Sequence, residues 1–217
     1  HRPQRVYEMY YTCGREKGIM NVVVVHRWDG VPSSDWYPWL RAELKKQGAR
    51  AAIPAMPNTE EPDIDRWVST LQSELPKPTT DTYFVGHSIG CQTIMRYLEK
   101  LPGRATVGGL VFVAGWFVLS NLEDEDVEAV ARPWMETPID AKTVREKTAN
   151  ITVFISSNDP YGMQRDNKKR FEKELGATVV MEKNKGHFTA DDGVTQVPEV
   201  LEAVMNMRTK EAKTTKA

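Results

Sequence analysis

The sequence is poor in cysteine and histidine, which restricts the kinds of site it can build. Cys13 and Cys91 are its only cysteines, and it has four histidines in 217 residues. Two cysteines are too few for a disulfide framework, and these two lack the close spacing of a metal site. We therefore expect a cytoplasmic protein, from a reducing compartment, with no bound metal and no cofactor.

Long apolar runs and an excess of charge of one sign are also missing. The longest apolar stretches, such as Val22 to Val25, have the length of a strand and fall short of the roughly 18 residues that span a bilayer. The formal net charge is −1, without the excess of lysine and arginine that binding to a nucleic-acid backbone requires. Membranes and nucleic acids are therefore not expected as partners.

The length of the chain suits one domain with a sizeable core. Residues 1–19 carry charges throughout and lack the apolar segment of a secretory signal, so they are interpreted as a tag or a flexible N-terminal extension. Residues 208–217 are polar and without apolar periodicity, which is typical of a flexible C-terminal tail. The domain itself is predicted to span 20–207.

From residue 20 onward, short β-branched runs alternate with longer amphipathic stretches, the pattern of an α/β fold with a mostly parallel sheet between helices. Six strands are predicted, over 20–25, 49–53, 82–85, 110–114, 151–156 and 178–181. Helices are predicted over 35–47, 64–74, 88–100, 165–175 and 198–207. Residues 116–150 interrupt this alternation and are interpreted as an insertion over the sheet edge.

The clearest motif is a serine between two glycines, in Gly86-His87-Ser88-Ile89-Gly90. It stands between a predicted strand and a predicted helix, so Ser88 would lie on a sharp turn that exposes its Oγ. The N–H of Ile89, at the start of the helix, could stabilise a developing oxyanion. The motif predicts a nucleophile at Ser88, although the same five residues also suit an ordinary tight turn.

A serine nucleophile requires a base and a carboxylate, which follow in the order Ser, Asp, His in one large class of hydrolases. Asp159 comes just after the predicted strand 151–156, at the sheet edge where catalytic groups collect. His187, in a loop after the next strand, is the one histidine that follows Asp159. These positions predict His187 as the general base and Asp159 as the residue that orients it. Each alone would be read as an ordinary turn or loop residue.

Further candidates concern the oxyanion and the substrate. The second oxyanion donor is expected from the loop after the first strand, as the backbone N–H of Arg27 or Trp28. The alternative is an unspecialised loop in which Trp28 packs against other tryptophans. Four side chains are candidates for substrate binding: His26, Trp116, Phe117 and Trp134. The three aromatic ones could equally cover the sheet as core residues.

With these residues in hand, the chain resembles the retinoblastoma-binding protein 9 family of small serine hydrolases, compact members of the α/β-hydrolase superfamily. The resemblance runs from about residue 21 to 207. It is carried by Asp35-Trp36-Tyr37-Pro38-Trp39-Leu40, Met56-Pro57, the serine pentapeptide, Met95-Arg96-Tyr97, Asn158-Asp159-Pro160-Tyr161 and Gly186-His187-Phe188. It implies a three-layer α/β-hydrolase fold and the same three catalytic residues.

Two departures from the resemblance limit what it implies. His26-Arg27 stands where many α/β-hydrolases have His-Gly, so the shape of the oxyanion loop differs. The retinoblastoma-binding role depends on a Leu-x-Cys-x-Glu segment, which this sequence lacks. That role is therefore not expected here.

The sequence thus predicts a serine hydrolase acting on a small acyl substrate, a carboxylic ester first, with thioesters and amides as alternatives. A competing hypothesis is a catalytically silent protein-binding module on the same fold. A metal-dependent hydrolase is disfavoured, because the sequence has no His-x-x-x-His pair and the acidic run Glu123–Asp126 has no histidine near it. No oligomeric state is predicted.

Overall fold

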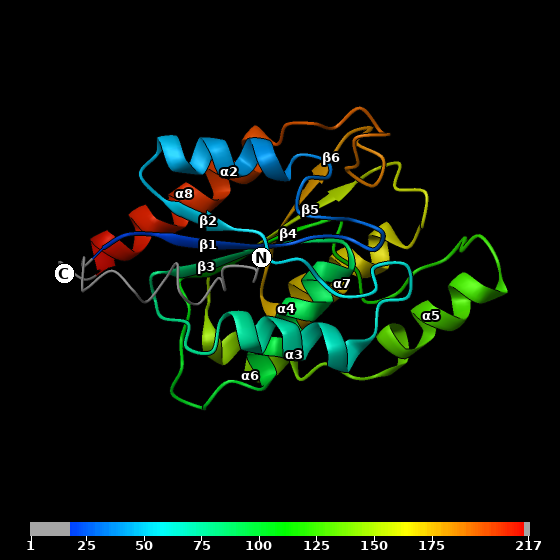
Figure 1. The fold of residues 1–217 in the computed structure, drawn as a ribbon, viewed down its shortest axis with the longest axis horizontal. Coiled ribbons are helices and arrows are strands. Elements are labelled where there is room, and N and C mark those ends of the chain that lie inside the picture. The colour runs from blue at the N-terminus through cyan, green and yellow to red at the C-terminus, as the bar shows by residue number, and fades with distance from the viewer. Residues whose placement is uncertain (1–17, 215–217) are drawn as a thin grey trace, which may run out of the picture.

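Six parallel strands form one sheet at the centre of the molecule (Figure 1). The computed structural model describes residues 18–214, with side chains through Arg208. The strands are β1 (Asn21–Val25), β2 (Arg50–Ala52), β3 (Thr82–His87), β4 (Gly109–Val113), β5 (Ile151–Ser156) and β6 (Thr178–Glu182). Their order in the sheet is β2-β1-β3-β4-β5-β6, and each neighbouring pair is parallel. The predicted sheet of about six strands is confirmed.

Helices cover both faces of this sheet, which makes three layers. The helices are α2 (Tyr37–Lys46), α3 (Ile64–Glu74), α4 (Ile89–Glu99), α5 (Glu125–Glu136), α6 (Ala141–Lys147), α7 (Gln164–Leu175) and α8 (Pro198–Thr214). In Figure 1, α2 and α8 lie above the sheet, and α3, α4 and α6 lie below it. Helix α8 runs to Thr214, past its predicted end at residue 207. The predicted extension and tail are otherwise largely outside the described residues, which exclude 1–17 and 215–217.

The strand β1 shows why the sequence of this sheet is so continuously apolar. Val22 and Val24 face the core shared with α2 and α8, whereas Val23 and Val25 face the core shared with α3 and α4. All four are completely buried. Because successive side chains of a strand point to opposite faces, a strand covered on both sides needs apolar residues at every position.

The interpretation of residues 116–150 as an insertion over the sheet edge is correct only in part. Helix α6 packs against α4 and α7 within the helical layer. Helix α5 instead projects beyond the sheet (Figure 1), with Asp124 capping its first turn by accepting from the N–H of Val127. Its other end is held by Arg96, whose Nη2 donates to the carbonyls of Trp134 and Thr137 at 3.0 and 2.8 Å. Acidic residues and a proline within α5 concealed that helix in the sequence pattern, and α6 is only seven residues long.

Candidate active site

Ser88 lies on the sharp turn between β3 and α4. Its backbone has φ 54° and ψ −121°, a strained conformation for a residue other than glycine. Its N–H donates to the carbonyl of Val113 at 2.9 Å, which ties the turn to β4. A Cβ on Gly90 would stand 2.2 Å from the carbonyl oxygen of Val25, and one on Gly86 would stand 2.8 Å from the backbone of Cys91. The glycines therefore allow α4 to begin directly against the sheet.

This close approach predicts a large effect of the smallest substitution at Gly90. Gly90→Ala is expected to lower the free energy of unfolding by about 3 kcal/mol or more, because its Cβ meets rigid backbone and not a movable side chain. Urea denaturation measures this change. The matched control is Gly103→Ala, where a Cβ meets nothing within 4 Å, and it should change stability by less than about 0.5 kcal/mol. Equal stability of the two variants would contradict this account of the turn.

The structure brings the three predicted catalytic residues together. The Nε2 of His187 lies 2.8 Å from the Oγ of Ser88, and its Nδ1 lies 2.9 Å from the Oδ2 of Asp159. A carboxylate only accepts, so Nδ1 carries the proton and Nε2 is left to accept from the Ser88 hydroxyl. The other carboxylate oxygen of Asp159 accepts the N–H of Tyr161 at 3.1 Å. The indole Nε1–H of Trp116 donates to Ser88 Oγ at 3.2 Å.

The loop that carries His187 is built around a second aspartate, Asp192, which the sequence analysis did not identify. Its Oδ2 accepts from the N–H of His187 at 2.8 Å and from the N–H and Oγ1–H of Thr189 at 3.1 and 2.7 Å. Burial acts to raise the pKa of Asp192, but these hydrogen bonds outweigh it and hold the pKa below its usual value. The Thr-x-x-Asp spacing, common in turns capped by side chains, was the available signal.

The two candidates for the second oxyanion donor differ in whether their N–H is free. The N–H of Arg27 donates to the hydroxyl of Tyr37 at 3.1 Å. Within residues 18–214, the N–H of Trp28 has no hydrogen-bond partner, while the next one along, of Asp29, donates to the carbonyl of Thr59. The N–H of Ile89 belongs to the first residue of α4, where N–H groups lack partners within the helix. Trp28 and Ile89 thus remain as candidate donors.

Of the four side chains expected to bind substrate, the structure places Trp116 alone at the cavity beside Ser88. Phe117 packs on Phe171, with ring centroids 4.6 Å apart. Trp134 is buried and donates to the carbonyl of Pro62 at 2.9 Å. His26 is completely buried, with Nε2 accepting the N–H of Met56 and Nδ1 against the carbonyl of Arg27. These three belong to the core, which corrects the expectation for them.

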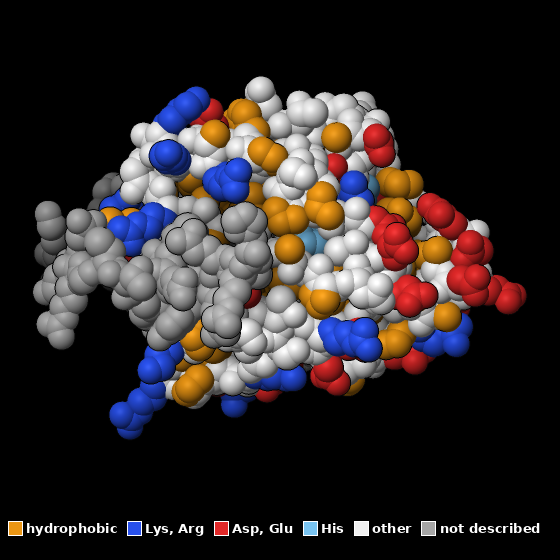
Figure 2. All heavy atoms as spheres, viewed as in Figure 1, with side chains coloured by type: hydrophobic (Ala, Val, Ile, Leu, Met, Phe, Trp, Pro, Cys, Tyr) orange, Lys and Arg blue, Asp and Glu red, His pale blue; other side chains and the backbone are white. Residues whose placement is uncertain are grey.

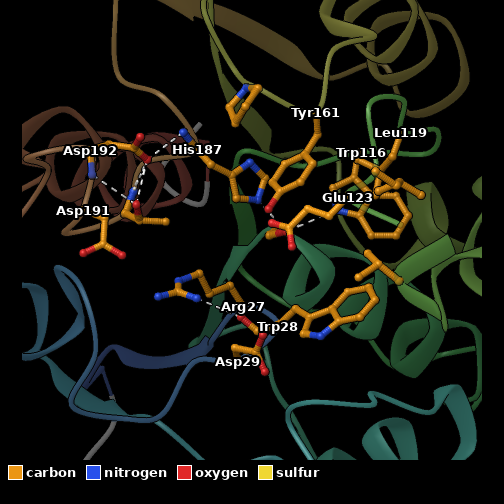
Figure 3. A pocket seen from close by; sticks show the side chains of 15 residues that line it. Arg27, Trp28, Asp29, Trp116, Leu119, Glu123, Tyr161, His187, Asp191 and Asp192 are labelled. Carbon is orange, nitrogen blue, oxygen red and sulfur yellow. Dashed lines mark hydrogen bonds between the residues drawn. The ribbon is translucent and has the colours of Figure 1, made fainter. Parts of the chain in front are cut away.

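The cavity over Ser88 has a volume of about 320 Å³ (Figure 3). Aromatic and aliphatic side chains form part of its wall: Trp28, Trp116, Leu119, Leu122, Val127 and Tyr161. Tyr161 meets the imidazole of His187 edge-on, with ring centroids 4.8 Å apart. Tyr161 could have been suspected from its place two residues after Asp159. The leucines lie in the segment where the sequence pattern was interrupted, so nothing marked them in advance.

The charged side chains of the cavity are mostly acidic. The carboxylates are Asp29, Glu123, Asp191 and Asp192. Figure 3 shows Glu123 and Tyr161 reaching toward His187 from the side opposite Asp191 and Asp192. Burial, and then the charges of Glu123 and Asp159, raise the pKa of Tyr161. The cation in the wall, Arg27, is already neutralised by an ion pair of 2.7 Å with Asp35. Figure 2 shows further acidic side chains at the end of the molecule where α5 begins.

Two other kinds of site were sought in the part of the chain that the structure describes. No three histidine, cysteine, aspartate or glutamate side chains there come close enough together to hold a metal ion. None of the helices in that part has both the length and the apolar character needed to cross a bilayer.

Comparison with known proteins places this geometry in context. A family model described as serine hydrolase matches residues 22–206. YdeN from Bacillus subtilis (strain 168) is 28% identical over 196 residues, which cover 88% of this chain and 98% of YdeN. The crystal structure of the ydeN gene product matches with a TM-score of 0.80 at 26% identity, over 88% of this chain and 99% of that one. The predicted α/β-hydrolase fold is thereby confirmed.

More distant solved structures share the fold. A structure from a study of carboxylesterases of Nitrososphaera gargenis matches with a TM-score of 0.65 at 14% identity, over 89% of this chain and 92% of that one. Est1E of Butyrivibrio proteoclasticus with bound ferulic acid matches with a TM-score of 0.67 at 13% identity, over 89% and 90%. At such identities the similarity concerns the fold alone.

Proposed function

This chain belongs to the serine hydrolase family, and we propose that it cleaves a small acyl substrate, a carboxylic ester above all, through an acyl-enzyme on Ser88. The observation that carries the proposal is the hydrogen-bonded series from Ser88 Oγ through both nitrogens of His187 to Asp159, with distances of 2.8 and 2.9 Å. Ser88 and His187 border a cavity of about 320 Å³, which is large enough to admit a small acyl group.

The proposed reaction follows from the protonation states that the hydrogen bonds require. Nε2 of His187 takes the Ser88 proton as Oγ attacks the acyl carbonyl carbon, while Asp159 stabilises the imidazolium that forms. The N–H groups of Ile89 and Trp28 donate to the oxyanion. The imidazolium then protonates the departing alcohol. Water, deprotonated by His187, attacks the acyl-enzyme, releases the carboxylic acid and restores the Ser88 hydroxyl.

The proposed reaction type extends to acyl substrates other than esters. The same residues would serve thioesters and amides, since the cavity and not the triad selects the substrate. A structure from a study of carboxylesterases shares the fold, and esters are the substrates that we propose first. The narrower resemblance to the retinoblastoma-binding protein 9 family and the cytoplasmic location both stay predictions.

Labelling with a fluorophosphonate probe tests the proposal, because only an activated serine forms the covalent adduct. We expect labelling of the native protein at the peptide that contains Ser88, and none after heat denaturation. Hydrolysis of 4-nitrophenyl esters of increasing acyl length then measures the reach of the cavity, with short chains expected to react fastest. A folded protein that is neither labelled nor active on any ester would favour the silent binding module instead.

Because the cavity is acidic, we expect the protein to prefer substrates that carry a positive charge. Esters matched in size are expected to follow the order cationic, neutral, anionic in kcat/KM, with roughly tenfold between the extremes at low salt. The reason is that Asp29, Glu123 and Asp191 form no ion pair within the described residues, whereas Arg27 does. Steady-state kinetics at low and high salt measure this difference, which added salt should reduce.

The variant Glu123→Gln should reduce the difference in kcat/KM between cationic and anionic esters, since it removes one carboxylate from the cavity wall. Glu125→Gln, on the exposed start of α5 and outside the wall, is the matched control and should leave the difference nearly unchanged. Fastest turnover of the anionic ester would refute the predicted charge preference.

A further inference from the structure

Three consecutive residues at the start of α2 contact both loops that border Ser88. Asp35 accepts the Nε–H of Arg27 at 2.7 Å through one oxygen and the N–H of Ala190 at 2.9 Å through the other. The Nε1–H of Trp36 donates to the carbonyl of Phe188 at 3.0 Å. The loop after β1 and the loop of His187 are thus held by the same short segment, in which Asp35 comes 8 residues after Arg27 but 155 before Ala190.

The third of these residues, Tyr37, belongs to a hydrogen-bond chain whose direction can be worked out. The backbone N–H of Arg27 donates to the Tyr37 hydroxyl at 3.1 Å, and that hydroxyl lies 2.7 Å from Nδ1 of His87. Nε2 of His87 lies 2.8 Å from the backbone carbonyl of His187, which can only accept. Nε2 therefore carries the proton of His87, and Nδ1 accepts from the tyrosine hydroxyl.

The surroundings of His87 maintain this arrangement. Its side chain is completely buried against the rings of Trp36, Tyr37 and His187. Burial, and then the charge of His187, lower the pKa of His87 to about 3. The Asp35 carboxylate, at 4.0 Å from Nδ1, favours the charged form but does not outweigh burial. At neutral pH, His87 thus stays neutral in one tautomer, with a single donor and a single acceptor.

We propose that Tyr37 and His87 are positioning residues for the hydrolysis, an inference that rests on the proposed function. They fix the loop of the second oxyanion donor relative to the loop of the catalytic base. By occupying the N–H of Arg27, Tyr37 also leaves the N–H of Trp28 as the free donor. Neither side chain lines the cavity, so both act through the backbone of their neighbours. Displacements of about 1 Å in such groups cost large factors in rate, so a rigid link between the loops matters for turnover.

The test compares two buried tyrosines: removing the hydroxyl of Tyr37 breaks its hydrogen bonds with Arg27 and His87, and removing that of Tyr97 breaks its hydrogen bond to Leu75. Tyr37→Phe is expected to lower kcat about tenfold with KM changed by less than about twofold, since the oxyanion contact strengthens in the transition state. It should weaken inhibition by a trifluoromethyl ketone, which forms an oxyanion on Ser88, by the same factor of about ten. The control is Tyr97→Phe, whose equally buried hydroxyl donates to the carbonyl of Leu75 at 2.6 Å, away from the cavity. It should also lower the thermal midpoint, though less than Tyr37→Phe does, and should keep parental kcat.

A second pair of variants tests the other half of the chain. His87→Leu removes the donor to the His187 carbonyl and should lower kcat at least as much as Tyr37→Phe does. His87→Gln keeps an N–H that can reach this carbonyl and should recover part of the loss. Parental kcat and parental ketone inhibition in Tyr37→Phe would overturn the inference while leaving the proposed function intact. A parent protein without labelling or hydrolysis would refute the proposed function, and the inference with it.

Discussion

Ser88→Ala is expected to lower kcat for a short ester by a factor of about 10⁶, leaving the residual rate that the oxyanion donors and substrate binding alone can support. The loss is large because Oγ both attacks the carbonyl and carries the acyl group, so no neighbouring side chain can replace it. Esterase kinetics at high protein concentration measure the residual rate. Labelling by the fluorophosphonate probe should disappear in parallel.

The stability of Ser88→Ala separates a catalytic loss from a folding loss. Alanine keeps the N–H that donates to Val113 and adds no atom to the crowded turn, so the thermal midpoint should change little. The matched control, Ser69→Ala, removes an exposed serine hydroxyl that bonds only to its own helix and should leave kcat unchanged. A folded Ser88→Ala protein with parental turnover would end the proposed function.

Asp159→Asn is expected to lower kcat by a factor of about 10⁴, although it changes the shape of the side chain very little. The oxygen that accepts the N–H of Tyr161 must stay an oxygen, so the new amide NH₂ would face His187. A donor at that position forces Nδ1 of His187 to accept and moves the imidazole proton to Nε2. An Nε2–H cannot take a proton from Ser88, which removes the general base.

Steady-state kinetics check this prediction, with Asp63→Asn as the control. Asp63 caps α3 by accepting the N–H of Arg66 at 2.9 Å, a role that asparagine fills as well, and it lies outside the cavity. Its kcat should equal that of the parent protein. A loss in Asp159→Asn of less than about tenfold would show that another group orients His187, and the role proposed for Asp159 would be wrong.

The residues recognised in advance were those tied to the ends of strands. Ser88, Asp159 and His187 each follow a run of apolar residues, and all parallel strands of one sheet end at the same edge. Their order in the chain and their distance from the preceding strand were therefore enough to predict that they meet. Asp192 was missed because it acts only through hydrogen bonds within its own loop.

The tryptophans show where this reasoning stops. Trp116 reaches Ser88, whereas Trp134, from the same interrupted segment, lies in α5 and packs against Trp67 of α3. The sequence pattern was identical in kind for both, since a large aromatic side chain suits a cavity wall and a core equally well. Their places depend on the path of the chain between β4 and β5, which no local periodicity describes.

By itself, the sequence determined the parallel sheet, the strained turn at Ser88 and the order of the three catalytic residues, because these follow from local periodicity and from the steric needs of glycine and serine. Only the tertiary structure decided which amide near Trp28 is free, which side chains line the cavity, and that Tyr37 and His87 join the two loops. Those features depend on contacts across 50 residues, from Tyr37 to His87, and across 100, from His87 to His187. Local patterns in the sequence do not predict such pairs. The partners come within hydrogen-bond distance only when the whole core packs.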